Sequence, residues 1–362
     1  MRVFIASILC AGFLMTEVGW GDNGPNHQTS SNSYGVSGGN VNDRSSAFCC
    51  GGTLGSLITD GTTSYILSNN HVLARSGAAS PGEAITQPGL IDNACQQARL
   101  VADLAPSPAL GTNVDAAVAA LRPGTMSLGG EILDIGQIST TVRPPAIGLS
   151  VAKSGRTTGL TYGSIQSVNA TVTVQYRLGC GSGKKFSVTY KNQIVITPGS
   201  FSAGGDSGSL VVTSDANCPQ PVGLLFAGSS TSTIANPIGE VLNKVGTALG
   251  RNVSFVGKTC TPSTTTTALS SGPSPAVVGN AASVLQEHLP ELMRGPVIGI
   301  GVGAAENNPL EAVLVVYIDR TQGVTPNLPD HVRGVRVRRM FTDPFVALPA
   351  CGSCNGGAAA CK

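Results

Sequence analysis

Short apolar runs separated by Gly, Ser, Thr and Asn recur along most of the chain. Within Cys50–Ile58 and Val168–Tyr176 apolar and polar positions alternate, which is the period of a strand that buries one face. Turn-forming residues such as Thr59–Thr63 follow these runs and favour hairpins. The pattern therefore predicts that the chain from 47 to 258 is built almost entirely of β-strands.

Helical spacing is found near the end of this region and again beyond it. Glu240–Val245 has the spacing of a closing helix, and Val277–Met293 places Leu285, Leu289 and Leu292 on one face. Strand-like runs then follow at Val297–Val302, Ala312–Ile318 and Val335–Met340.

This second group of elements is set apart by composition. Residues 259–275 are rich in Ser, Thr and Pro, which is typical of a linker. We therefore expect a small α+β domain at 276–348, followed by a Cys-containing tail at 349–362.

The N-terminus has the pattern of a targeting segment. One basic residue precedes the apolar run Val3–Met15, which is too short to span a bilayer and fits a secretory signal peptide within residues 1–20. A start-site artefact or a buried N-terminal strand is the alternative. Residues 21–46 are rich in Gly, Asn and Ser, and this composition favours disorder.

Composition narrows the classes of partner. Of the 362 residues only 12% are charged, the net charge is +2, and aromatic residues make up 4%. We therefore expect no nucleic-acid partner and no stable membrane insertion after removal of the leader. Self-association through residues 276–348 stays open.

Ten cysteines in a chain of low charge favour an oxidising compartment, so the protein is expected to be secreted or periplasmic. If Cys10 leaves with the leader, nine remain and one is unpaired. The pairing cannot be derived from the sequence. Cys351 and Cys354 have the spacing of half a zinc site, but no second pair completes it, so a disulfide or a loose tail is favoured and no metal or other cofactor is expected.

The clearest chemical signal is the turn Gly204–Ser209, which holds Ser207 between glycines and precedes the apolar run Leu210–Val212. Glycines let the backbone bend sharply and let a substrate carbonyl approach. A serine in such a turn becomes a nucleophile when a base can take its proton. An idle hydroxyl in a Gly/Ser hairpin is the alternative.

A base and a carboxylate lie upstream in suitable settings. His71 stands in a polar turn after the apolar run Tyr65–Leu67, and Asp115 stands directly before the apolar run Ala116–Leu121. Asp92 and Asp103 are rival carboxylates, but the continuous apolar run makes Asp115 the one expected to be buried beside the imidazole.

These three stretches occur in the same order and with similar spacing in chymotrypsin-like serine peptidases, and residues 47–258 resemble that family. The resemblance implies a trypsin-like serine protease domain with a double six-stranded β-barrel, the first barrel at 47–122 and an interbarrel connection at 123–145. The run Gly295–Gly303, with the strands after it, resembles a module in bacterial and plant narrow-leaf-type trypsin-like proteins.

The resemblance also assigns roles. Catalytic residues would be His71, Asp115 and Ser207, and the backbone amides of Gly205 and Ser207 would form the oxyanion hole. Substrate-binding residues would be Phe201, Ser202, Phe226, Ala227 and Gly228. An apolar Phe201 without a nearby carboxylate argues against a Lys or Arg preference, although Phe201 as a packing residue of the core is the alternative.

One further expectation concerns Asp206. In chymotrypsin relatives a new N-terminus, released by cleavage, pairs with the Asp before the nucleophile, and no such activation sequence is visible here. We therefore expect internal groups to satisfy Asp206.

The sequence thus predicts a serine endopeptidase that acts on protein or peptide substrates. A catalytically idle binding or scaffold protein on the same fold is one alternative. A protease limited to self-processing is another.

Overall fold

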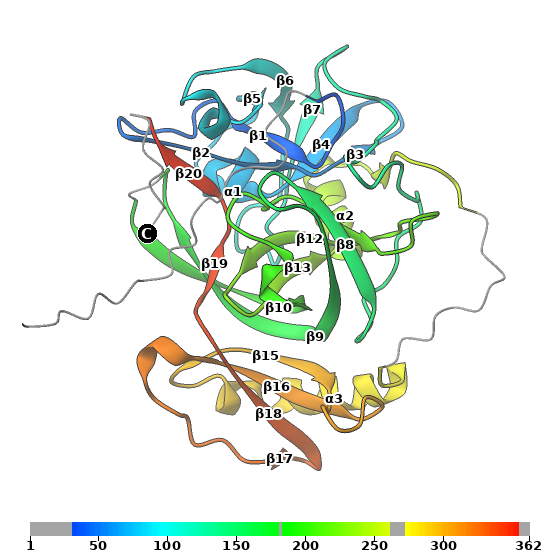
Figure 1. The fold of residues 1–362 in the computed structure, drawn as a ribbon, viewed down its shortest axis with the longest axis vertical. Coiled ribbons are helices and arrows are strands. Elements are labelled where there is room, and N and C mark those ends of the chain that lie inside the picture. The colour runs from blue at the N-terminus through cyan, green and yellow to red at the C-terminus, as the bar shows by residue number, and fades with distance from the viewer. Residues whose placement is uncertain (1–30, 181–182, 261–271, 355–362) are drawn as a thin grey trace, which may run out of the picture.

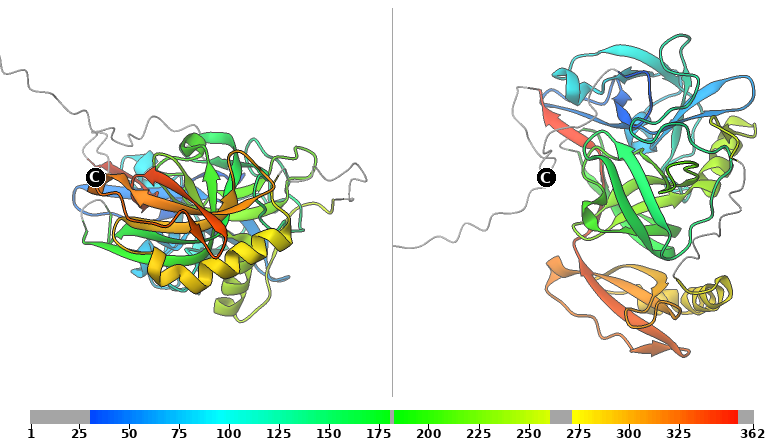
Figure 2. Two further views of the ribbon diagram at one scale, coloured as in Figure 1. Left: turned by 90° about the horizontal axis from the view of Figure 1, so that it is seen from below. Right: turned by 45° about the vertical axis from the view of Figure 1, so that its right-hand side comes forward.

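The computed structural model describes residues 31–180, 183–260 and 272–354 (Figure 1). The predicted signal peptide and most of the predicted linker lie outside these residues. Within them, two β-barrels are stacked and a smaller α+β module follows below the second barrel (Figures 1 and 2). No helix in the described ranges is long and apolar enough to cross a membrane.

The first barrel closes because one strand bends at Gly55. β2 and β3 follow each other across this glycine, and the remaining strands close the ring in the order β3-β4-β7-β6-β5-β1-β2. A Cβ at Gly55 would lie 1.9 Å from the Gly208 carbonyl oxygen, so only glycine fits at this bend. The strands are β1 Val36–Asn40, β2 Phe48–Leu54, β3 Ser56–Thr59, β4 Ser64–Ser68, β5 Ala84–Gln87, β6 Arg99–Leu104 and β7 Ala117–Leu121.

Strand β1 corrects, within the described residues, the expectation that residues 21–46 are disordered; residues 21–30 lie outside the described part of the chain. All five residues of Val36–Asn40 are buried and pair with β2 and β5. Its glycines explain the difference, because a Cβ at Gly38 would lie 2.4 Å from Leu54 Cγ. The Gly-rich composition that favours disorder in isolation here permits a strand to pack closely over a large side chain.

The second barrel closes through its two longest strands. β9 pairs with β8 and β10, and β10, β13, β12, β11 and β8 complete the ring. Its strands are β8 Ser150–Gly155, β9 Gly159–Arg177, β10 Lys185–Thr197, β11 Leu210–Thr213, β12 Pro221–Gly228 and β13 Thr233–Pro237. Helix α2 (Ile238–Leu249) then leads back to the first barrel, where β14 (Ser254–Phe255) pairs with β3.

The C-terminal module extends the sheet of the second barrel. β15 pairs with the part of β9 that projects beyond β8, from Ser167 to Val172. Its apolar core, which includes Leu285 and Leu314, is continuous with second-barrel residues such as Val151 and Ile196. The elements are α3 Pro275–Leu292, β15 Val297–Ala304, β16 Ala312–Asp319, β17 His331–Val332 and β18 Val335–Thr342.

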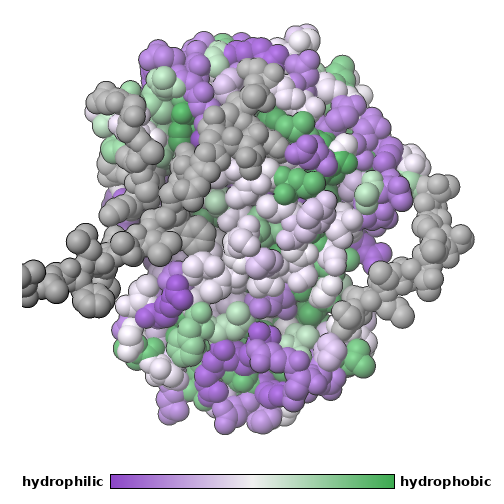
Figure 3. Space-filling model, viewed as in Figure 1, coloured by the Kyte–Doolittle hydropathy of each residue, from purple (hydrophilic) through white to green (hydrophobic). Residues whose placement is uncertain are grey.

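The chain then returns from the module to both barrels (Figure 1). β19 (Phe345–Ala347) adds to β12 and β9 of the second barrel. β20 (Ala350–Ser353) adds to β2 of the first barrel. On the face shown in Figure 3, hydrophilic residues gather over the first barrel at the top and over the module at the bottom.

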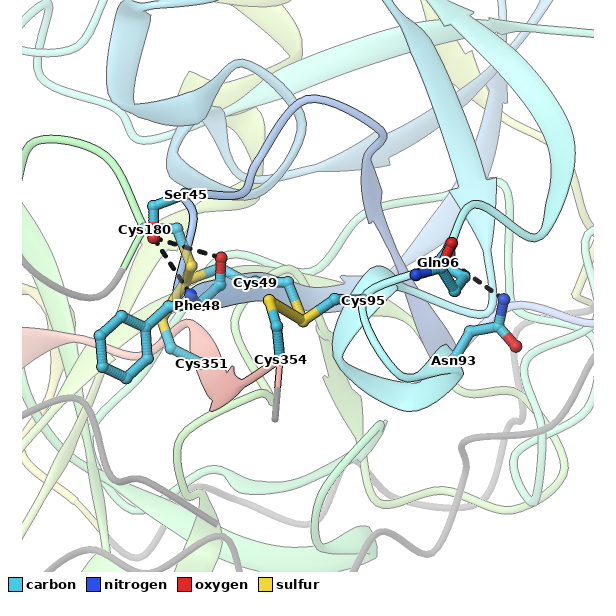
Figure 4. Close-up of a disulfide and its surroundings, with 10 residues drawn as sticks. Ser45, Phe48, Cys49, Asn93, Cys95, Gln96, Cys180, Cys351 and Cys354 are labelled. Atoms are coloured by element: carbon cyan, nitrogen blue, oxygen red, sulfur yellow. Dashed lines mark hydrogen bonds between the residues drawn. A yellow bond between two sulfur atoms is a disulfide. The ribbon is translucent and has the colours of Figure 1, made fainter. Parts of the chain in front are cut away.

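The eight cysteines within the described residues form one separate pair and two groups of three. Cys218 pairs with Cys260. Cys50 lies within bonding distance of both Cys180 and Cys351, and Cys95 lies within bonding distance of both Cys49 and Cys354 (Figure 4). A sulfur forms one disulfide at a time, so the two pairings in each group are alternatives.

Cys351 and Cys354 of the predicted tail are therefore not partners of each other. Cys351 belongs to one group of three and Cys354 to the other. Cys351 lies in β20 and Cys354 directly follows its last residue, so this part of the predicted tail contains an ordered strand.

Candidate active site

His71 lies on the short helix α1 (Asn70–Leu73) that follows β4. Its side chain faces Asp115, whose Oδ2 is 2.6 Å from His71 Nδ1. Asp115 Oδ1 also accepts a hydrogen bond of 3.2 Å from the backbone amide of His71. The carboxylate thus holds the imidazole with Nδ1 as a donor, and this leaves Nε2 as the atom able to accept a proton.

Asp115 lies two residues before the start of β7 and is fully buried. Its position is set from both barrels. The side-chain amide of Asn69 donates to the Asp115 carbonyl at 2.6 Å, and the Asp115 amide donates to Asn236 Oδ1 at 3.0 Å. Because these contacts fix the backbone of Asp115, its carboxylate can orient His71 without a loss of entropy at each reaction.

Tyr176, which the sequence did not single out, is a third donor to the carboxylate. Its hydroxyl donates to Asp115 Oδ2 at 2.9 Å and lies 2.7 Å from the hydroxyl of Tyr190. Burial, and secondly the charge of Asp115, raise the pKa of Tyr176 well above its ordinary value, so the hydroxyl stays a donor. No local motif marks Tyr176, because its partner comes from the other barrel.

The rival carboxylates are engaged elsewhere. Asp92 forms a buried, bidentate ion pair with Arg156. Asp103 pairs with Arg122, and this contact lowers the pKa of Asp103. The structure therefore places Asp115, and neither of its rivals, against His71.

Ser207 stands in a turn that requires glycine on both sides. Gly205 has φ +101° and Gly208 has φ +93°, values that side-chain-bearing residues rarely adopt. The turn packs on the first barrel, where the Thr53 amide donates to the Ser207 carbonyl at 2.8 Å. The two barrels approach each other closely at Gly52. A Cβ there would lie 2.6 Å from Val72 Cγ2 and 3.0 Å from the Ser207 carbonyl oxygen.

The Ser207 hydroxyl does not point to the histidine in this structure. It is fully buried and donates to the Phe226 carbonyl at 3.2 Å. His71 Nε2 is buried without a hydrogen-bond partner among the described residues. Ser207 and His71 Nε2 are therefore not hydrogen-bonded to each other in this structure.

Asp206 is satisfied from inside, as the sequence predicts. Its carboxylate accepts hydrogen bonds from the amides of Thr157 and Ala203, at 2.9 Å each, and lies 3.3 Å from Lys153 Nζ. Lys153 and Asp206 are both fully buried. Lys153 could not be identified as this partner from the sequence, because it comes from β8, far from the turn along the chain.

The predicted substrate-binding residues line one edge of the turn. Ala227 and Gly228 lie at the end of β12, and the buried Ser202 hydroxyl is 2.6 Å from the Thr233 hydroxyl. Phe226 presents its carbonyl to Ser207, while its ring packs edge-on against Tyr190 at 4.9 Å. Phe201 is 1% exposed and its ring centroid lies 6.0 Å from Lys153 Nζ, which favours its packing role.

No protein-family model and no curated protein sequence matches the chain. Among solved structures, a glutamic acid specific serine protease has 21% sequence identity and a TM-score of 0.42, over 62% of this chain and 98% of that one. Thermobifida fusca Protease A has 20% identity and a TM-score of 0.39, over 61% and 98% of the two chains. Cellulomonas bogoriensis chymotrypsin has 18% identity and a TM-score of 0.38, over 62% and 99%.

These similarities leave more than a third of this chain uncovered, and their TM-scores lie below 0.5. The strand pairing of this chain is more direct evidence for its fold. Two closed barrels, joined as described, with His71, Asp115 and the Ser207 turn where they meet, give the chain a chymotrypsin-like double-barrel fold with an added C-terminal α+β module.

Proposed function

We propose that the protein is a serine endopeptidase that hydrolyses peptide bonds through His71, Asp115 and Ser207. The observation that carries the proposal is the buried contact of 2.6 Å between His71 Nδ1 and Asp115 Oδ2, next to a serine held in a glycine turn. A histidine oriented in this way is the base that a serine nucleophile needs.

The chemistry would run in two halves. Ser207 Oγ attacks the substrate carbonyl while His71 Nε2 takes its proton, and the proton then passes to the leaving amine. Water next attacks the acyl-enzyme with the same histidine as base, which releases the acid and restores Ser207. Asp115 keeps the ring oriented and stabilises its cation, and the amides of Gly205 and Ser207 donate to the oxyanion.

The groove favours uncharged residues before the scissile bond. Gly228 and Ser202 form the wall proposed for the specificity pocket, and neither carries a charge that could pair a substrate Lys or Arg. Burial of an unpaired cation is costly. Protein or peptide substrates with apolar or small residues at this position are the proposed class.

The disulfides support an oxidising location, so we propose that the protein acts after secretion or in a periplasm. An idle scaffold is the second candidate. It is favoured by the buried Ser207 hydroxyl, which donates to Phe226 rather than to His71.

A fluorophosphonate probe separates the two candidates, because it reacts only with an activated serine. We expect a covalent adduct that peptide mapping places on Ser207, and no adduct in Ser207→Ala. Ser209→Ala is the matched control, since Ser209 is buried in the same turn and bonds the Asp206 carbonyl. Complete absence of labelling, in the wild type and in the Leu348 variants described below, would favour the scaffold.

A further inference from the structure

The segment Phe345–Ser353 crosses the candidate active site from the second barrel to the first. We propose that it is an internal inhibitor, bound in the groove where a substrate peptide would lie. This inference rests on the proposed peptidase function, and it adds how that function is restrained.

The first half of the segment lies where an extended peptide can add to β12. Ala347 is paired with Ala227 and Val346 with Gly228, in antiparallel register. The Leu348 amide then donates to the Phe226 carbonyl at 3.3 Å. Backbone pairing of this kind is how extended peptides bind to an exposed strand.

The next contact reaches the proposed oxyanion hole. The Leu348 carbonyl accepts a hydrogen bond of 2.7 Å from the Gly205 amide, which is one of the two donors assigned to the oxyanion. A substrate carbonyl must take this position to be attacked. The Leu348 carbonyl therefore stands where the carbonyl of the scissile bond would stand.

The side chain of Leu348 is accommodated beside Gly228. Leu348 is 4% exposed, and a Cβ at Gly228 would lie 3.1 Å from Leu348 Cδ1 and 3.7 Å from Ser202 Oγ. The leucine side chain thus lies against Gly228, one of the residues proposed for the specificity pocket, and Ser202 lies beside the same glycine. The groove therefore accommodates an apolar, branched side chain on the residue whose carbonyl accepts the hydrogen bond from the Gly205 amide.

The second half of the segment holds the other side of the site. β20 pairs with β2 over four residue pairs, from Gly51 with Ala350 to Phe48 with Ser353. Cys351 and Cys354 lie against Cys50 and Cys95 of the first barrel (Figure 4). The segment is therefore fixed on both sides of the Leu348 carbonyl.

Two features would keep this segment intact. The bond after Leu348 leads to Pro349, whose nitrogen carries no hydrogen and whose ring restricts the backbone. The part beyond the bond is also held by β20, so an amine released by cleavage would stay beside the acyl-enzyme and re-form the bond. A bound segment that is not lost blocks the groove against other peptides.

The sulfur groups supply a way to attach and release the segment. When Cys50 pairs with Cys351, β20 is covalently joined to β2. Attack of the Cys180 thiolate on the Cys50 sulfur forms the Cys50–Cys180 disulfide and releases Cys351 as a thiolate. This exchange is balanced and needs no outside oxidant or reductant.

The test uses the full chain with one change in the segment. Leu348→Glu places a charge in the apolar space and should release the segment, and Leu348→Ala removes the anchor without adding a charge. Leu310→Glu is the matched control, because Leu310 is 66% exposed in the module. All four proteins are compared by thermal unfolding to establish that they are folded.

The first measurement is the rate of labelling of Ser207 by a fluorophosphonate probe. We expect Leu348→Glu to react at least about tenfold faster than the wild type, because a site competent in a small fraction of molecules reacts in proportion to that fraction. Leu348→Ala should lie between them, and Leu310→Glu should match the wild type. Equal rates in all four folded proteins would overturn the inhibitor and leave the peptidase standing.

The second measurement tests whether the segment occupies the peptide-binding groove, and it does not depend on catalysis. In a Ser207→Ala background, a fluorescent Phe-Val-Ala-Leu peptide should bind to Leu348→Glu and not to the parent chain, as followed by fluorescence anisotropy. Binding of this kind with no labelling of any variant would support the occupied groove and overturn the peptidase. Equal binding to the parent and to Leu348→Glu would overturn the inhibitor.

Discussion

The Tyr176 hydroxyl lies 2.9 Å from Asp115 Oδ2, although the two residues come from different barrels. Tyr176 is on β9 of the second barrel, and Asp115 precedes β7 of the first. The carboxylate that orients His71 is therefore held by both halves of the protease fold. Tyr176 is a positioning residue, because it acts on the histidine through Asp115.

Tyr176→Phe should lower kcat about tenfold and leave KM nearly unchanged, since one hydrogen bond to a charged group is lost. A carboxylate with one donor fewer attracts the His71 proton more strongly, so the acid limb of the kcat/KM profile should move to higher pH. Peptide hydrolysis measured across pH 5–9, a range of about two pH units on either side of neutrality, tests this.

Tyr162→Phe is the matched control, because Tyr162 is 62% exposed on the same strand. An unchanged pH profile for Tyr176→Phe, with a fall in thermal stability alone, would make the tyrosine a purely structural residue.

The carboxylate assignment gives a second prediction. Asp115→Asn should lower kcat by about 10³- to 10⁴-fold while the protein stays folded, because the imidazole loses its orienting charge. Ser207→Ala and His71→Ala should each remove nearly all hydrolysis, since the three groups act as a unit. Rates are measured on short peptides, with circular dichroism to check the fold.

Asp103→Asn is the control for the rival carboxylate, because Asp103 pairs with Arg122 away from His71. An active Asp115→Asn beside an inactive Asp103→Asn would reverse the assignment.

Much of the fold follows from local patterning. The alternation at Val168–Tyr176 lies inside β9, and the helical spacing of Val277–Met293 matches α3. The predicted double barrel with a small α+β region is confirmed. These elements are predictable because the spacing of apolar residues along the chain matches the period at which a strand or a helix buries its side chains.

The parts that were missed depend on distant partners. β1 forms a strand because its glycines allow close packing against Leu54 and Gly51 of β2. Its Gly-rich composition alone does not predict a strand. The Tyr176 contact depends on Asp115 of the other barrel, and the path of Phe345–Ser353 through the site depends on pairing with β12 and β2. Local propensity carries no information about such contacts, and only the assembled barrels supply it.

Asp43 gives a prediction for the pH dependence of stability. Burial raises the pKa of Asp43 to about 7, against the partly opposing charges of Arg75 and His71. A carboxyl whose pKa is raised on folding stabilises the fold while it is protonated. This contribution is complete below the unfolded pKa, near 4, and is lost as the pH rises through about 7.

Asp43→Asn should therefore raise the free energy of unfolding at pH 8 by a few kcal/mol, on the order of what a shift of this size represents, and leave it nearly unchanged at pH 4. Urea unfolding at both pH values measures the difference. Asp60→Asn serves as the comparison, because hydrogen bonds from the Thr63 and Thr62 amides lower the pKa of Asp60. A gain at pH 8 no larger than at pH 4 would contradict the prediction.

The buried pair of Lys153 and Asp206 gives a fourth prediction. Lys153→Met leaves the Asp206 carboxylate without its cation beneath the nucleophile turn, and removal of one partner of a buried pair costs about 3–5 kcal/mol. We expect a loss of that size in the free energy of unfolding. The double variant Lys153→Met with Asp206→Asn should recover part of it, because no unpaired charge remains. Equal stability of the single and double variants would show that the charge pair is not the cause.

The last prediction concerns the residue before the scissile bond. Leu348 occupies the space beside Gly228 and Ser202, and neither residue carries a charge, so cleavage should favour apolar residues such as Leu over Lys or Arg. A peptide library digested by Leu348→Glu, with the same variant carrying Ser207→Ala as the blank, gives the preference. Cuts concentrated after Lys or Arg would reject it.

The same pocket can be given a charge. Ser202→Asp should raise cleavage after Lys relative to Leu by about tenfold or more, because a buried carboxylate would pair with the substrate cation. Ser214→Asp is the matched control, since Ser214 is exposed in the turn after β11, and it should leave the ratio unchanged. The ratio of kcat/KM values for paired Lys and Leu peptides is the quantity to measure. If Ser202→Asp leaves that ratio unchanged in a folded and active enzyme, the residue beside Leu348 does not line the specificity pocket.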